Sequence, residues 1–327
     1  MRIYKNNLWM ESMINFRKKA LCAAIGATLT VSAVPLLAAE VGNFFNADSN
    51  SKLKVGVFYS NATRDVEQDG SVNIASFSES ETYIGEGTEV STFSVKSQLK
   101  NLDGEEDNDD IYLKISYALT PKIELYTKLG ATATKLDADN GTESTTVSES
   151  LTEDGELISS ETNTESVDAQ QQASSQRTDY GWMVGFGSKV VLLEWDSGWN
   201  LGLDGQYIYR KQDMDKNFWA GTSEFKLTDH DSHEIQGSLL LGKSEGNFRP
   251  YGGVSFTKYK SEYDLDYKGT SPPPSDNYKL GGELEYENED EFGFFGGFEF
   301  NLNSATVSFE LRAGDEEGVS LGLNFPL

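Results

Sequence analysis

The chain has 327 residues, including 31 glycines, 15 tyrosines and 18 phenylalanines, and its formal net charge at pH 7 is −26. A charge this negative predicts no binding of nucleic acid, because contacts to phosphates require a basic face. The mean hydropathy is −0.48. Beyond the N-terminus no run approaches the ~18 apolar residues of a transmembrane helix, which argues against a helical membrane protein.

Residues 1–39 have the features of a cleaved signal peptide. Basic residues at 17–19 precede a long apolar core, and small residues end it at Ala39. We expect cleavage near Ala39 and an N-terminal periplasmic segment over residues 40–51. Cleavage removes the single cysteine, Cys22, so no disulfide bond can stabilise the mature chain. A buried or membrane-anchoring helix is the alternative interpretation of this segment.

Period-two alternation of apolar residues recurs along the rest of the chain and predicts about ten β-strands. In water, faces of large apolar side chains would aggregate, whereas the outer wall of a membrane barrel requires them. The predicted strands span about 52–61, 110–119, 122–134, 180–192, 199–210, 233–242, 249–260, 292–302, 306–312 and 319–327. The alternation is clearest in the last strand, where the apolar residues are Val319, Leu321, Leu323, Phe325 and Leu327.

Short connections alternate with long ones, as in barrels with tight turns on one side of a membrane and extended loops on the other. Only the short connection near residue 314 breaks this alternation. Within the first long loop, residues 82–84 and 90–95 are interpreted as a hairpin. The alternative is two further wall strands, which would give a barrel of twelve. The predicted surface loops are about 62–108, 136–178, 213–232 and 264–290.

We therefore expect residues 52–327 to form an all-β, transmembrane, antiparallel up-and-down β-barrel; a soluble periplasmic β-protein is the architectural alternative. The hairpin at 117–126, the strand at 249–254 and the alternating C-terminal strand resemble small Gram-negative outer-membrane β-barrel proteins. Among these, the OmpA-type transmembrane domain is the best-known member of a porin-like barrel superfamily. The resemblance implies the cell outer membrane as location and outer-membrane lipid and lipopolysaccharide as partners. It also implies that the barrel-assembly machinery recognises the last strand.

Inward positions of the predicted strands carry charges of both signs in similar number. A ten-stranded barrel is little wider than the eight-stranded kind that side chains fill, which favours a closed, ion-paired interior over a charged pore lining. The predicted lumen charges are Lys54, Lys114, Glu124, Lys128, Lys189, Asp204, Arg210, Glu299, Glu310 and Arg312. Aromatic residues near strand ends predict girdles at the membrane interfaces. These are Tyr117, Tyr126, Trp195, Trp199, Tyr207, Tyr209 and Phe325.

Both histidines of the chain, His230 and His233, lie beside Asp229 and Asp231 in a predicted loop. Imidazoles and carboxylates together can bind a metal ion or form an acid–base pair, and the pattern is loosely similar to the rim of ten-stranded omptin proteases. Solvated loop residues are the simpler interpretation, and we predict no enzyme.

The predicted loops are rich in acidic residues. The loop at 136–178 has too few apolar residues for burial to offset the conformational entropy that it would lose on becoming ordered, and we expect it to be mobile. Divalent cations are candidate ligands of these loops, although no EF-hand spacing occurs; no other cofactor is expected. The sequence thus predicts a structural or surface-interaction protein that displays acidic extracellular loops. A narrow porin-like channel is the alternative, and a rim hydrolase comes last.

Overall fold

The computed structural model describes residues 40–42, 52–84, 88–138, 141–153, 156–169, 176–220, 223–243, 246–267, 279–280, 282–302 and 304–327. The signal peptide predicted for residues 1–39 lies outside them. Within the described part of the chain, no helix has the length and apolar character needed to cross a membrane.

The described residues form β-strands joined by turns. The strands are β1 (Leu53–Gln68), β2 (Ser71–Ile84), β3 (Thr88–Lys100), β4 (Gly104–Thr120), β5 (Ile123–Ala138), β6 (Gly141–Glu153), β7 (Glu156–Ala169), β8 (Gln176–Arg177), β9 (Gly181–Glu194), β10 (Trp199–Ala220), β11 (Ser223–Lys243), β12 (Phe248–Tyr267), β13 (Lys279–Leu280), β14 (Gly282–Asn288), β15 (Phe292–Asn301), β16 (Thr306–Ala313) and β17 (Glu317–Pro326).

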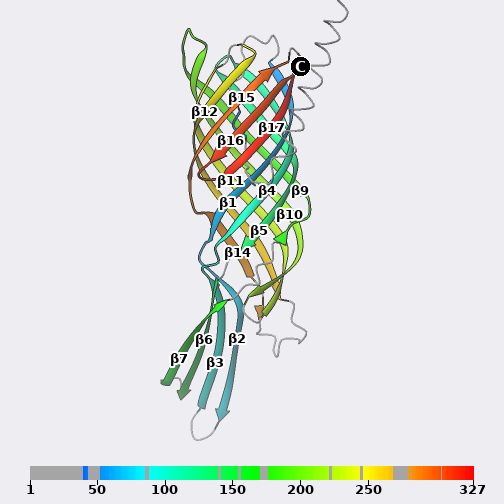
Figure 1. Ribbon diagram of the computed structural model, residues 1–327. Helices are drawn as coiled ribbons and strands as arrows, with labels where there is room; N and C mark the ends of the chain where they lie inside the picture. Colours follow the sequence, from blue (N-terminus) through cyan, green and yellow to red (C-terminus); the bar gives the residue numbers. More distant parts are fainter. Residues whose placement is uncertain are drawn as a thin grey trace, which may run out of the picture. The chain divides into compact units, whose positions relative to one another are not determined.

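Ten of these strands close into an antiparallel ring. Within the described residues its order is β1, β4, β5, β9, β10, β11, β12, β15, β16 and β17 (Figure 1). The closing pair, β1 with β17, runs from Lys54 opposite Pro326 to Thr63 opposite Glu317. The short strand β14 pairs with residues 260–265 of β12, beyond the part of β12 that pairs with β15, and it also pairs with β1. Closure gives every wall strand a neighbour on both sides. The predicted antiparallel β-barrel of about ten strands is confirmed.

Several barrel strands are longer than predicted. Strands β10 and β11 pair with each other through residues 213–220 and 223–232, and residues 221–222 lie outside the described part of the chain. The prediction of a loop over residues 213–232 is therefore wrong. The reason lies in the outward side chains. Beyond Tyr209 they are Lys211 and Asp213, so the apolar alternation that marks a strand in the sequence stops although the backbone pairing continues.

A second antiparallel sheet has the order β13, β2, β3, β6, β7. Its strands lie in three stretches that were predicted as loops, 62–108, 136–178 and 264–290. Within 136–178 the described residues 141–153 and 156–169 pair as strands, and the prediction that this segment is mobile stays a prediction. Among the described residues, β2 and β3 pair with each other and not with any of the ten wall strands, which supports the hairpin interpretation of residues 82–84 and 90–95 over two additional wall strands.

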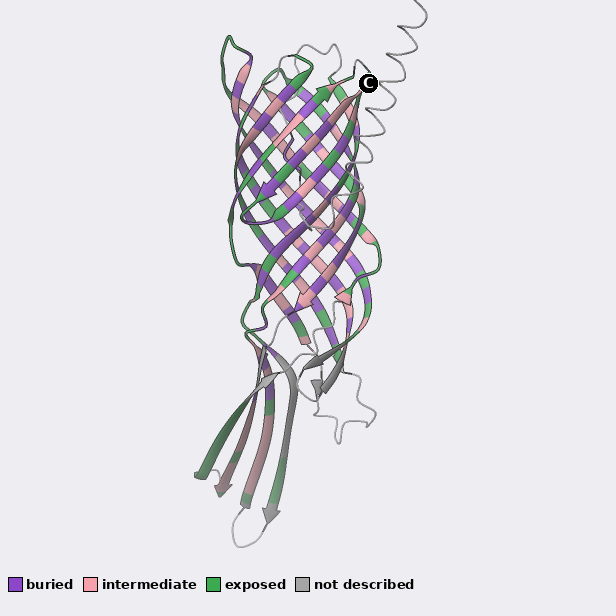
Figure 2. Cartoon of the chain, viewed as in Figure 1, coloured by how far each residue is buried: buried purple, intermediate pink, exposed green. Residues whose placement is uncertain are grey.

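Side chains of the barrel alternate between its outer and inner surfaces, as the exposure colours along each strand show (Figure 2). On β4, Ile111 and Leu113 are 51% and 41% exposed, whereas Tyr112 and Lys114 between and after them are 3% and 5% exposed. The exposed outer positions are mostly large and apolar. They include Val57, Tyr59, Leu125, Leu129, Trp182, Phe186, Leu203, Ile235, Leu239, Val254, Phe256, Phe292, Phe294, Leu311, Leu321, Leu323 and Phe325.

Candidate functional site

The predicted lumen charges all lie on the inward face of their strands. Nine of the ten are buried, and Lys54, near the start of β1, is partly buried. One of them, Glu299, pairs with Arg249, which the sequence analysis did not predict; the guanidinium and the carboxylate are 2.9 Å apart. The structure therefore brings these charges together inside the ring, and the candidate site is this charged interior.

Arg210 on β10 links two carboxylates from different strands. Its guanidinium lies 2.9 Å from Asp110 on β4 and 3.0 Å from Glu234 on β11. The same Glu234 oxygen lies 3.2 Å from Nη2 of Arg64 on β1. Strand β11 is five places from β1 in the ring of ten. The contact between Arg64 and Glu234 therefore spans the diameter of the barrel.

The chain of ion pairs continues on the other side of Arg64. Its Nη2 lies 2.6 Å from Glu316, which precedes β17. Glu316 is 2.6 Å from Nη1 of Arg312 on β16, and Nε of Arg312 is 3.0 Å from Glu310. Every member has a side chain at most 5% exposed. We call the seven side chains from Asp110 to Glu310 the lumen network.

Four members of the lumen network were absent from the sequence prediction: Arg64, Asp110, Glu234 and Glu316. Arg64 and Glu316 lie beside exposed polar residues, Asp65 and Glu317, so no apolar alternation in the sequence marked the strand at these positions. A signal existed for Glu234, because extending the alternation back from Leu239 and Ile235 places residue 234 on the inward face.

A second polar group lies next to the lumen network. The Tyr126 hydroxyl donates to Asp204 at 2.9 Å, and Lys128 donates to Gln206 at 2.8 Å. Tyr126 is 4% exposed and points inward. Its predicted place in an outer aromatic girdle is therefore wrong, because residue 126 has the parity of the inward positions on β5.

A small cavity remains among these inward charges. Its volume is about 30 Å³, which suits about one water molecule. Lysines and carboxylates in equal number line it, so it offers no excess of either charge. They are Lys54, Lys114, Lys189, Glu40, Glu124 and Glu299.

The structure does not bring together the two histidines of the predicted metal site. His230 is fully buried, faces inward and contacts Gln212 through Nδ1. His233 lies on the outer face, where its Nδ1 is 2.7 Å from the Tyr207 hydroxyl and its ring is 4.8 Å from that of Tyr209. Because both residues belong to one strand, β11, and differ in parity, they point to opposite surfaces of the sheet. Asp229 and Asp231 share the outward parity of His233.

The outer aromatic residues of this region form a continuous group. Trp182 packs edge-on against Tyr209 at 5.3 Å, and Phe186 stacks on Tyr207 at 5.8 Å between ring centroids. His233 contacts both tyrosines. These residues lie where the outward side chains of β10 change from apolar to charged, as the predicted girdle requires.

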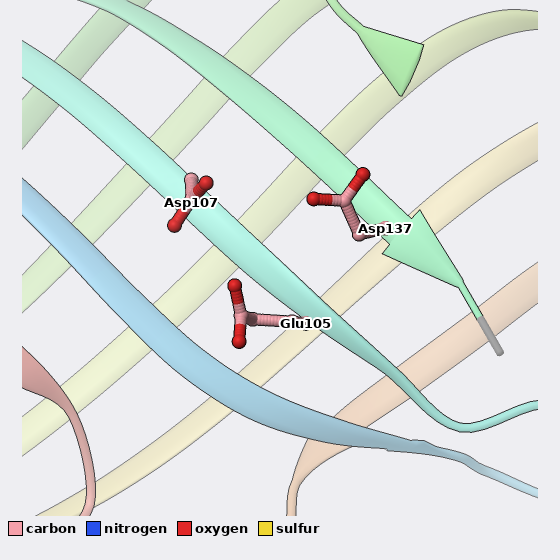
Figure 3. A group of neighbouring side chains, drawn as sticks. All are labelled: Glu105, Asp107 and Asp137. Carbon is pink, nitrogen blue, oxygen red and sulfur yellow. The ribbon is translucent and has the colours of Figure 1, made fainter. Parts of the chain in front are cut away.

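One group of carboxylates outside this apolar region has spacing that suits a cation. Glu105 and Asp107 on β4 approach Asp137 on β5 (Figure 3). Burial, followed by the charges of Asp107, Asp65 and Asp137, raises the pKa of Glu105. The ammonium of Lys135 lies 3.4 Å from Asp107 and also pairs with Asp137. A basic side chain thus already neutralises part of this group.

No protein-family model matches the sequence, and the search of curated proteins found no match. Solved structures with a similar arrangement include the translocator domain of the autotransporter NalP from Neisseria meningitidis, with 8% identity, a TM-score of 0.34 and coverage of 98% of this chain and 99% of that one. The transport unit of the autotransporter AIDA-I from Escherichia coli has 9% identity, a TM-score of 0.29 and coverages of 88% and 93%. An outer membrane channel from Pseudomonas putida F1 has 12% identity, a TM-score of 0.29 and coverages of 88% and 98%.

These likenesses are too weak to assign an activity to this chain. The fold itself rests on the strand pairing, which defines an all-β protein with a closed antiparallel barrel of ten strands among the described residues.

Proposed function

We propose that this chain is an outer-membrane barrel protein that anchors an acidic surface structure and conducts no solutes. The observation that carries the proposal is that the wall has apolar side chains, mainly phenylalanine and leucine, on its outer surface and ion pairs in its interior, the reverse of a water-soluble protein. In water such an outer surface would drive aggregation. Against hydrocarbon it is the stable arrangement, since a closed barrel also satisfies all backbone hydrogen bonds of its wall.

The height of the apolar region supports a membrane-spanning role. On β4 the outward residues are Asp107 and Asp109 at one end, and then Ile111, Leu113 and further apolar residues up to Leu119. That apolar stretch covers nine residues of the strand, close to the ~9–11 tilted residues that cross a bilayer. The polar remainder of β4 then lies outside the membrane, together with the acidic group around Glu105.

The filled interior favours anchoring over transport. The lumen network joins opposite walls of the barrel through contacts of 2.6–3.2 Å. A permeating ion or solute would have to separate buried ion pairs, and removing one partner from such a pair typically costs about 3–5 kcal/mol.

The displayed structure is the second sheet. Strands β6 and β7 carry three and four acidic residues respectively and no basic residue. We propose that this surface interacts with cationic partners or ions outside the cell. Export would use the signal peptide at residues 1–39, and membrane insertion would use the barrel-assembly machinery acting on β17, whose residues Val319, Leu321, Leu323 and Phe325 face outward.

Planar-bilayer recording of the purified full chain tests the absence of transport. We expect no reproducible conductance steps, while a known porin reconstituted in the same bilayers provides the positive control. Insertion is verified independently by membrane fractionation and by heat-modifiable gel migration. Reproducible single-channel steps from the inserted protein would replace anchoring with the channel interpretation.

A further inference from the structure

Residues Glu40–Gly42 lie inside the barrel, although they belong to no strand. Glu40 is 2% exposed, Val41 is 0% exposed and Gly42 is buried. The sequence predicted residues 40–51 as a periplasmic segment. For these three residues that prediction is wrong, because the inward side chains of the wall provide partners that a segment in water would lack.

The backbone of this segment is held by charged side chains. The N–H groups of Val41 and Gly42 donate to the two carboxylate oxygens of Glu310, at 3.0 and 2.8 Å. The ammonium of Lys128 donates to the carbonyl oxygen of Glu40 at 2.9 Å. Buried carboxylates and ammonium groups require such partners, since an unpaired buried charge is costly.

The side chains of the segment also have matching partners. The Glu40 carboxylate accepts a hydrogen bond from Lys114 at 2.9 Å, and both side chains are at most 5% exposed. Val41 packs in an apolar cluster with Leu240, Tyr251 and Phe295. An acidic residue followed by a small apolar residue therefore fits this part of the interior.

Gly42 completes the match between segment and site. Its φ is +67°, a conformation that side chains with a Cβ rarely adopt. A Cβ built there would lie 2.1 Å from Oε1 of Glu40 and 3.3 Å from Nζ of Lys189. The positive φ is the feature that favours glycine at residue 42, since the ends of the Glu40 and Lys189 side chains can move.

We propose that the barrel interior contains a binding site for the N-terminus of the mature chain, a peptide that begins Glu-Val-Gly and plugs the lumen. The proposal rests on the proposed function in one respect, which is that cleavage near Ala39 makes Glu40 the first residue. The ligand class is an acidic N-terminal peptide. The site consists of Lys114, Lys128, Glu310 and the apolar cluster around Val41.

Thiol labelling tests this site directly. Cys22 is replaced by alanine and Val41 by cysteine, so that the folded chain carries one thiol, and labelling by a bulky water-soluble maleimide is followed in detergent. We expect labelling at least about tenfold slower in the folded protein than in the urea-unfolded protein, because a buried thiol reacts only when the structure opens locally.

Two further variants link the protection to the proposed partners. Glu310→Gln removes a carboxylate that holds both backbone N–H groups, and Lys128→Met removes the donor to the Glu40 carbonyl. Each should accelerate labelling of residue 41 by about tenfold or more. The matched control is Glu106→Gln, which neutralises an inward carboxylate that accepts hydrogen bonds from the Tyr259 and Tyr263 hydroxyls and lies eight residues along β4 from Lys114; it should leave the rate unchanged. Heat-modifiable migration confirms folding of each variant, and Lys128→Met decides the question where Glu310→Gln does not fold.

Equal labelling rates in the folded and unfolded states would overturn the proposal, as would acceleration by Glu106→Gln equal to that by Lys128→Met. These outcomes are separate from a failure of the proposed function. Labelling reports where the N-terminal segment lies, whereas bilayer conductance reports whether the barrel transports solutes.

Discussion

The barrel wall and the second sheet share one backbone design but differ in their side chains. In the wall, strands β4 and β5 alternate apolar outward residues with inward polar or charged ones. In the second sheet, strands β6 and β7 carry serine, threonine and glutamate at positions of both parities, with hydroxyl pairs such as Thr146–Thr164 across the strands. Both ladders are antiparallel. The difference shows that the medium on each side of a sheet, rather than its hydrogen bonding, determines the side-chain pattern.

Charge pairing differs between the two regions in the same way. Inside the barrel, opposite charges meet, as Arg210 does with Asp110 and Glu234. In the second sheet, like charges lie directly opposite each other, as Glu149 does with Glu161. Such pairs are destabilising, but water and salt screen them at exposed positions. The following predictions test this contrast, beginning with the largest expected effect.

Arg210→Ala should destabilise the barrel by about 3–5 kcal/mol, because it leaves Asp110 buried without its basic partner. The measurement is the urea midpoint of heat-modifiable migration in detergent micelles. Lys96→Ala, which removes an exposed charge from β3 of the second sheet, is the matched control and should have little effect. Equal losses for both variants would remove the distinction between the two regions.

Leu113→Arg should cost about 2–4 kcal/mol in lipid, the typical penalty for a cation at the middle of a barrel's lipid-facing surface. Thr164→Arg on β7 places the same side chain on an exposed strand of the second sheet and should change stability by about 0.5 kcal/mol or less. Folding in lipid vesicles over a urea series measures both. An unaffected Leu113→Arg variant would show that residue 113 does not face hydrocarbon.

Glu105→Gln should stabilise the protein slightly at neutral pH, by about 0.5 kcal/mol or less because solvent screens this group. Since the pKa of Glu105 is raised on folding, the folded state holds its proton more tightly than the unfolded state. The resulting penalty is absent below pH 4.5, its ordinary pKa, and grows as the pH rises through the raised value. Urea midpoints of both proteins at several pH values should therefore coincide in acid and separate toward pH 7. The opposite trend would mean that Lys135 dominates the environment of Glu105.

Replacing residues 139–175 by a short glycine-serine linker should leave the barrel intact. This deletion removes β6 and β7, which contribute none of the described residues of the buried apolar cluster that includes Val72 and Leu99. Heat-modifiable migration and the urea midpoint should match those of the full chain. Loss of the folded form would show that the second sheet is required for the barrel rather than carried by it.

The sequence was informative where one surface of a strand meets a different medium from the other. The alternation in β17 and the inward parity of Arg312 and Glu310 follow directly from period two, and so the number of wall strands was predictable. The strands β6 and β7 were not, because serine, threonine and glutamate at both parities leave no periodic signal. For the same reason the extension of β10 beyond Tyr209 was interpreted as a loop.

Parts of the candidate site required the tertiary structure. The pairing of Arg64 with Glu234 depends on which strands lie opposite each other in the closed ring, which alternation alone does not specify. The position of Glu40 inside the barrel had no sequence signal, since three residues outside any strand carry no periodicity. For His230 and His233, a spacing of three within a strand predicts opposite faces, and only their assignment to a loop allowed a shared metal site.

Lipid accessibility along β4 tests the central claim that hydrocarbon surrounds an apolar wall with a charged interior. Single cysteines at each position from 109 to 119, in a chain with Cys22 replaced, are spin-labelled in vesicles and probed with oxygen and with a water-soluble nickel chelate. Odd positions from Ile111 onward should favour oxygen, even positions should be shielded from it, and Asp109 should favour the chelate. Uniform accessibility at odd and even positions, or preference for the chelate at Leu113, would contradict the account.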